Sequence, residues 1–166
     1  MDEKPILEKT FNEDLDVEKL VREGGIHGRL YIEVQGNNME AAKKALESVV
    51  FGRLASERNV SILHAKMFDI VKDEESDGKE EVFSGVIEVE LVSRDFRWFV
   101  NMVMRYGPSA IEIIAPEEVR LKSDQVHSLV ADVSEMTQVY ANQIMSLMKD
   151  EERLAMYKKL LAEEQD

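Results

Sequence analysis

Apolar residues alternate with other residues in the segment that begins at Gly28, and this alternation predicts a β-strand. Leu30, Ile32 and Val34 fall on one face of the strand, and the residues between them fall on the other. Such a strand has one buried face and one face open to water. Further strands are predicted at about 60–71, 81–92 and 110–115.

Two helices are predicted between these strands. Asn38 is a capping residue before the first helix, and Ser93 is one before the second. Gly107 is predicted to take the left-handed position after the second helix, and Pro108 prevents its continuation. The expected core positions of the first helix are Met39, Ala42, Ala45, Leu46, Val49, Val50 and Leu54, and those of the second are Phe96, Phe99, Val100, Val103 and Met104.

The order strand, helix, strand, strand, helix, strand predicts an α+β domain of the ferredoxin-like, split βαβ kind. Right-handed crossovers would leave both helices on one face of a four-stranded antiparallel sheet. The other face would then be solvated, covered by the tail, or buried against another subunit. We therefore divide the chain into an N-terminal arm or short helix at 1–25, a ferredoxin-like domain at 26–120 and a helical extension at 121–166.

The helical extension carries a continuous apolar stripe from Ser123 onwards. Its residues are three, four or seven positions apart, which predicts a long amphipathic helix. Either one helix continues to the end or two helices meet at a bend near Asp150, and we favour the bend. The stripe would pack on its own domain or pair with a second copy. Its members are Val126, Val130, Val133, Tyr140, Ile144 and Leu147, followed by Leu154, Tyr157, Leu160 and Leu161.

Composition and charge narrow the possible partners. The 166 residues carry a formal net charge of -13, which repels phosphate backbones, so no direct nucleic-acid binding is predicted. The hydrophobic content of 44% supports one folded core, and the chain contains no cysteine, which excludes thiol chemistry and disulfides. Neither a signal peptide nor a membrane segment is recognisable, so the expected location is the cytoplasm.

No residue pattern marks a catalytic centre, a metal site or a cofactor site. The string Asp73, Glu75, Asp77, Gly78 begins like a calcium loop but has Ser84 where the bidentate acid belongs, so a hairpin turn is the better interpretation. The acids Glu33, Glu88, Glu90 and Glu112 are raw material for a carboxylate site on the strands, although Glu88 and Glu90 share one environment. His27, in a glycine-rich turn, is expected to cap or contact backbone.

Four aromatic or basic residues are candidates for an interface or a ligand site. Trp98 lies between Phe96 and Phe99 on the second helix, and the three rings cannot all face the core. Trp98 is therefore expected to be partly exposed, either as an interface anchor or packed at the rim of the core. Arg105 and Tyr106 precede the Gly107 turn, where a ligand or a neighbouring chain can approach. Tyr140 lies on the stripe of the tail.

The segment from Phe96 to Tyr140 resembles the C-terminal extension, or WCX domain, of WYL-type bacterial transcriptional regulators. That resemblance implies a ligand-sensing or subunit-contacting module and not a catalyst. The chain lacks the helix-turn-helix and β-barrel that normally precede the extension, so promoter binding is not implied. The matching residues are Trp98, Phe99, Val100, Tyr106, Gly107, Pro108, Ile111, Ile113, Pro116, Glu117, Glu118, Val119, Arg120 and Tyr140.

These observations predict a noncatalytic regulatory or interaction domain. It would self-associate or bind a protein partner through its sheet face or its C-terminal helices. The alternative is a small-molecule-sensing domain with a ligand near Arg105 and Tyr106, and an enzyme with a carboxylate site on the sheet is the third hypothesis.

Overall fold

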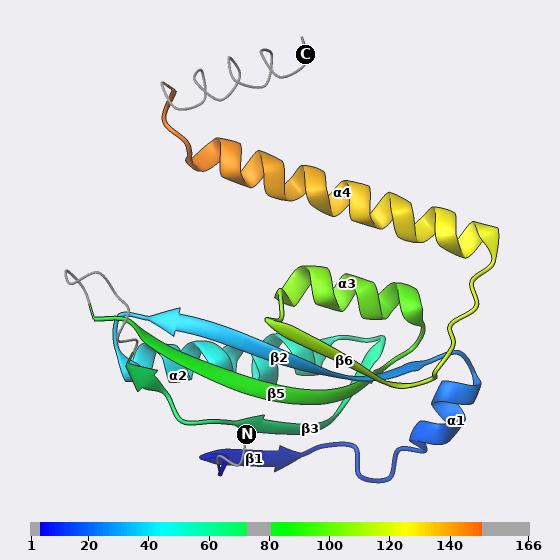
Figure 1. Ribbon diagram of the computed structural model, residues 1–166, viewed down its shortest axis with the longest axis horizontal. Helices are drawn as coiled ribbons and strands as arrows, with labels where there is room; N and C mark the ends of the chain where they lie inside the picture. Colours follow the sequence, from blue (N-terminus) through cyan, green and yellow to red (C-terminus); the bar gives the residue numbers. More distant parts are fainter. Residues whose placement is uncertain (1–3, 73–80, 151–166) are drawn as a thin grey trace. The chain divides into compact units, whose positions relative to one another are not determined.

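The computed structural model describes residues 4–72 and 81–150 (Figure 1). The chain divides into two compact units, Met1–Lys122 and Ser123–Asp166. The first unit contains a β-sheet with its helices, and the described part of the second is one long helix.

Among the described residues of the first unit, six strands form one sheet with helices between them. The order along the chain is β1 (Leu7–Thr10), α1 (Val17–Arg22), β2 (Ile26–Gly36), α2 (Met39–Glu47), the π-helix η1 (Ser48–Arg53), the 3-10 helix η2 (Leu54–Ser56), β3 (Val60–Met67), β4 (Val71–Lys72), β5 (Phe83–Ser93), α3 (Phe96–Tyr106) and β6 (Ala110–Ala115). This is an α+β arrangement.

Every strand pair in the sheet is antiparallel. The strands lie in the order β1, β3, β5, β2, β6, and β4 pairs with β5 beside this path. The sheet thus has six strands and not the four predicted, because β1 adds an outer strand to β3 and β4 adds a short one to β5. The central pair is the longest, with β2 and β5 in continuous register from Ile26 opposite Ser93 to Gly36 opposite Phe83.

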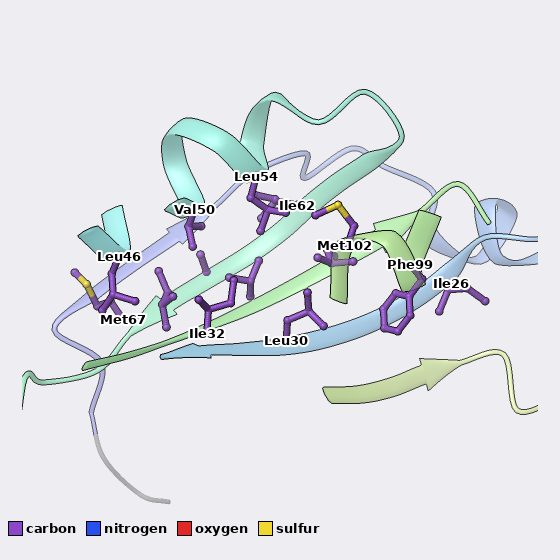
Figure 2. Close-up of a cluster of buried hydrophobic side chains, with 14 residues drawn as sticks. Ile26, Leu30, Ile32, Leu46, Val50, Leu54, Ile62, Met67, Phe99 and Met102 are labelled. Atoms are coloured by element: carbon purple, nitrogen blue, oxygen red, sulfur yellow. The ribbon is translucent and has the colours of Figure 1, made fainter. Parts of the chain in front are cut away.

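The core lies between one face of the sheet and the helices. Figure 2 shows Leu46, Val50 and Leu54 approaching the strands from the same side as Phe99 and Met102. The predicted alternation of β2 is confirmed, since Leu30 and Ile32 are buried in this cluster. Both helical segments therefore cover one face of the sheet, and the other face carries the side chains at the alternate positions.

The helix predicted over residues 39–54 changes type part-way along. Asn38 caps α2 as predicted, by accepting a hydrogen bond from the backbone N–H of Ala41 at 2.7 Å. The buried positions then recur at intervals of four residues, and in an α-helix each such step overshoots a full turn by about 40°. The wider π-helical turn η1 removes part of this drift. It keeps one face on the sheet through the fully buried Ala42, Leu46, Val50 and Leu54.

The N-cap of helix α3 lies two residues after the predicted cap, Ser93. Asp95 accepts a hydrogen bond from the backbone N–H of Trp98 at 2.9 Å and is the N-cap. Ser93 instead ends β5, where it is buried and donates its hydroxyl to the carbonyl of Asp95. Gly107 ends the helix with φ of 52°, the left-handed conformation that was predicted.

The N-terminal segment forms a strand of the sheet as well as the predicted short helix. Residues 7–10 form β1, which pairs with β3 from Leu7 opposite Met67 to Thr10 opposite His64. Lys9 lies over the rings of Phe11 and Phe51, 4.9 and 5.2 Å from the ring centroids. The short helix predicted before Gly24 is present as α1.

The described part of the second unit is α4 (Ser123–Leu147), a helix of 25 residues that buries none of them. Exposed apolar residues follow one another along it from Val126 to Leu147. The helix ends at Leu147, shortly before the predicted bend at Asp150. The predicted second stripe, from Leu154 to Leu161, lies outside the described residues.

Candidate functional site

A pocket of about 210 Å³ opens in the first unit between β2, η1 and the end of α3. The last residues of α3 provide Arg105 and Tyr106, two of the four predicted site residues. The π-helix provides Val49 and Arg53, and β2 provides the sheet side of the wall. The lining residues are Ile32, Glu33, Val34, Val49, Arg53, Arg105 and Tyr106.

One carboxylate holds both predicted residues of the pocket wall in position. Glu57, one residue beyond η2, accepts hydrogen bonds on Oε1 from Arg105 Nη1 at 2.7 Å and from the Tyr106 hydroxyl at 3.0 Å. Burial and the hydrogen bond to Glu57 raise the pKa of Tyr106 to about 12. The phenol therefore stays protonated near neutral pH, which makes it a fixed donor and not a proton acceptor.

Arg53 is the cation of the pocket that the fold leaves available. Among residues 4–72 and 81–150, no carboxylate forms an ion pair with its guanidinium, whereas Arg105 is bound to Glu57. Arg53 is the last residue of η1, and π-helical turns occur often at functional sites. An exposed guanidinium beside the apolar Val34 and Val49 can bind the anionic group of a ligand whose other atoms are apolar.

The sheet face opposite the core carries a ladder of charged side chains. Arg29 on β2 is its centre: Nη1 donates to Glu112 of β6 at 2.9 Å, and Nη2 donates to Glu90 of β5 at 3.2 Å. Arg29 Nε is buried without a hydrogen-bond partner and lies 3.6 Å from Glu88. Lys66 of β3 reaches the same Glu88 carboxylate at 3.4 Å. Of the four predicted acids, Glu88, Glu90 and Glu112 are therefore held by cations from neighbouring strands, whereas Glu33 lies in the lining of the pocket.

The two histidines of the sheet lie at the margins of this ladder. His27 Nε2 is 2.8 Å from Glu90 Oε1, and His64 Nε2 is 2.9 Å from Glu8 Oε1. The predicted backbone contact of His27 is wrong, because β2 already begins at Ile26 and strand geometry turns the ring towards the neighbouring strand. Alternating positive and negative side chains thus run from β1 across to β6.

The ladder makes stability depend on acid pH through Glu90. Burial raises the pKa of Glu90, but hydrogen bonds from His27 and Arg29 outweigh burial, so the pKa lies below its ordinary value of 4.5. The unfolded chain then takes up this proton first as the pH falls, so the stabilisation is complete above that value and is lost as the pH falls through the folded pKa. Glu90→Gln is expected to flatten the acid decline of the unfolding free energy, measured by urea titration between about pH 7 and about pH 3.

The matched control for this prediction is Glu40→Gln. The Glu40 side chain is 77% exposed and pairs with Lys44 one helical turn away, an arrangement that contributes little to stability. The control should keep the acid slope of the parent protein. An unchanged slope in Glu90→Gln would contradict the role given to the ladder.

The other two predicted site residues lie elsewhere. Trp98 is half-buried on α3, one residue from the buried Phe99, and does not line the pocket. Tyr140 belongs to α4 in the second unit, where its side chain is 38% exposed. The structure therefore brings Arg105 and Tyr106 into one site and leaves Trp98 and Tyr140 outside it.

Metal chemistry has no site within residues 4–72 and 81–150, where no three His, Asp or Glu side chains gather in a way that would hold an ion. The calcium-like string from Asp73 to Gly78 and its predicted hairpin turn lie outside the described residues. In the part of the chain that the structure describes, no helix has the length and hydropathy to cross a membrane.

Comparison with known proteins decides the family. The model of the MJ0538 family matches residues 27–164, which is most of the chain. The chain belongs to the MJ0538 family. A curated relative, the "Uncharacterized protein MJ0538" of Methanocaldococcus jannaschii, is 28% identical over 99 residues, which are 60% of this chain and 35% of the relative. The chain thus spans about a third of the length of that relative. No solved structure matches.

Membership of the MJ0538 family fixes no activity, because neither the family nor the relative is described by a function. The matched region includes β2 from its second residue, the pocket, α4 and the charged ladder apart from Glu8 on β1. The resemblance of the segment from Phe96 to Tyr140 to WYL-type regulators stays a prediction.

Arg53, which lines the pocket, and Glu57, which holds its wall, were not predicted. Arg53 directly precedes Leu54, the last residue of the predicted helix stripe, and Glu57 lies in the short connection after η2. Neither belongs to a recognisable motif, and both meet α3 only through the tertiary fold. The ladder had a clearer signal, since Arg29 and His27 alternate with the core residues of β2 just as Glu88 and Glu90 alternate with those of β5.

Proposed function

We propose that this chain is a noncatalytic interaction domain that associates with a second copy of itself through α4. The observation that carries the proposal is the spacing of one stripe of exposed residues on that helix, six of them apolar and the seventh Thr137. The members of this stripe recur at alternating intervals of four and three, the repeat of helices that pair side by side. The positions are Val126, Val130, Val133, Thr137, Tyr140, Ile144 and Leu147.

The charge distribution supports a second copy as the partner. Two copies that each carry a net charge of -13 repel one another over most of their surface. Along α4, however, Asp124, Asp132 and Glu135 are the only Asp, Glu, Lys or Arg residues, although such residues make up 33% of the chain. None of these three acids lies on the stripe from Val126 to Leu147, so two copies can pair along it without bringing charged side chains into the seam.

Helix stability gives a second reason for pairing. Valine, isoleucine and threonine have lower helix propensity than alanine or leucine, and helices in proteins gain most of their stability by packing an apolar face. Val130 is 61% exposed and Ile144 is 56% exposed in the single chain. Pairing would remove this apolar surface from water, at about 25 cal/mol for each Å² buried.

The sheet face supports the noncatalytic part of the proposal. Of the four acids considered for a carboxylate site, Glu88, Glu90 and Glu112 are each engaged by Arg29, and Glu33 lies apart from them in the lining of the pocket. General acid-base work requires carboxyl groups with separated pKa values that can reach a substrate. Carboxylates bound into a ladder of opposite charges are suited to holding strands together. We also propose the ferredoxin-like description for the part of the sheet made by β3, β5, β2 and β6.

The mass of the whole chain in solution tests the proposal. Sedimentation equilibrium over a range of micromolar concentrations is expected to give a particle of twice the 19.0 kDa of one chain. The association should survive high salt, because an apolar helix pair does not depend on ion pairs. A particle with the mass of one chain at every concentration would overturn the proposal.

A further inference from the structure

We propose that the pocket between β2, η1 and α3 binds a small aliphatic monocarboxylate. The carboxylate would lie against the guanidinium of Arg53, and the apolar body would lie on Val34 and Val49. This site belongs wholly to the first unit and does not rest on the association of α4.

The cationic part of the pocket sets the chemistry of the ligand head. A guanidinium presents a planar set of N–H donors that matches the two oxygens of a carboxylate. Arg105 is already bound to Glu57 at 2.7 Å, so it forms a fixed wall, whereas Arg53 has no such partner within residues 4–72 and 81–150. The hydrogen bond from Tyr106 to the same oxygen of Glu57 also fixes this wall.

The formal charge around the pocket sets the charge of the ligand. Arg53 and Arg105 are opposed by Glu33 in the lining and by Glu57 behind it, so the formal charges cancel. A doubly charged phosphate would meet two neighbouring carboxylates and gain one unpaired arginine. A ligand with a single negative charge matches Arg53 and meets about half of that repulsion.

The size and the remaining lining set the body of the ligand. The volume of about 210 Å³ is below the range of about 300–1,000 Å³ for pockets that hold drug-sized molecules. Ile32, Val34 and Val49 give it an apolar floor. A branched chain of a few carbons with one carboxylate fits both features, and so few atoms predict millimolar affinity.

Titration of the full chain with sodium isovalerate, followed by amide chemical shifts, tests the inference. Saturating shifts are expected at Val34, Val49 and Tyr106, with little change across the sheet face at Glu88. Isovaleramide, which has the same shape without the charge, is the matched ligand control and should give no saturation. Inorganic phosphate is expected to bind more weakly than isovalerate.

Arg53→Ala is expected to weaken isovalerate binding by about tenfold or more, because it removes a hydrogen bond to a charged group. Arg120→Ala removes an arginine whose side chain is 85% exposed and should leave the affinity unchanged. An unaltered amide spectrum away from the pocket shows that Arg53→Ala remains folded. Three results would overturn the inference: absence of saturation with isovalerate, equal binding of isovaleramide, or full affinity in Arg53→Ala.

Discussion

Aspartate at both Val133 and Ile144 is expected to convert the paired chain into single chains at every micromolar concentration. Both positions lie on the apolar stripe of α4, where they are 39% and 56% exposed before pairing. Pairing would bury four added carboxylates in one apolar seam, and the effective desolvation penalty is several kcal/mol for each ion. Sedimentation equilibrium measures the change directly.

The matched control places the same two charges on another face of α4. Gln138→Asp with Asn142→Asp adds two carboxylates four residues apart, outside the stripe that Val133 and Ile144 share. This variant should keep the mass of the pair. A control that dissociates as fully as the stripe variant would assign the effect to net charge, and a stripe variant that stays paired would place the interface elsewhere.

The largest single loss of stability is expected for Phe99→Ala. The Phe99 side chain is 3% exposed and packs directly on the backbone of β2, since a Cβ added at Gly28 would lie 2.7 Å from its ring. Truncation removes the buried ring and leaves a cavity, which costs about 3–5 kcal/mol of unfolding free energy. Urea unfolding monitored by circular dichroism gives the difference.

Trp98→Ala is the comparison for this prediction, because it removes a larger ring from the next residue of the same helix. Trp98 is only half-buried and is not part of the buried cluster. It should cost clearly less than Phe99→Ala. If Trp98→Ala lost as much unfolding free energy as Phe99→Ala or more, the assignment of Phe99 to the core and of Trp98 to its margin would be wrong.

The parts of the fold that could be predicted are those set by local chemistry. The period-two alternation of β2 follows from its burial on one face, and Leu30 and Ile32 lie where the pattern places them. Asn38 marks a helix start because its side chain accepts a hydrogen bond from a backbone N–H of the first turn. Gly107 marks a helix end because glycine readily adopts the left-handed conformation in which its N–H bonds to a carbonyl of the last turn. These signals require no knowledge of distant residues.

The elements that could not be predicted depend on partners far away in the chain. Strand β1 is exposed at every position, so its residues show no alternation, and its pairing with β3 alone makes it a strand. The π-helical turn η1 forms because Leu46, Val50 and Leu54, spaced four residues apart, must all face the sheet. Ser93 was a plausible cap until the length of β5 made Asp95 the cap.

The candidate pocket shows the same division between local and distant signals. Arg105 and Tyr106 could be predicted because they stand next to a marked helix end. Glu57 could not, since it is 48 and 49 residues away from Arg105 and Tyr106, and Arg53 comes to line the same pocket only after α3 has packed. Hydrogen bonds between side chains of separate elements leave no spacing pattern in the sequence.

The pairing of β1 with β3 has a consequence for any shortened form of the chain. Ile6 and Phe11 extend this pairing with backbone hydrogen bonds to Met67 and Leu63. A fragment that begins at β2 would leave the outer amides and carbonyls of β3 without partners, as an open template for another strand. Such a fragment would tend to aggregate through its own sheet margin, even though its core and its pocket were intact.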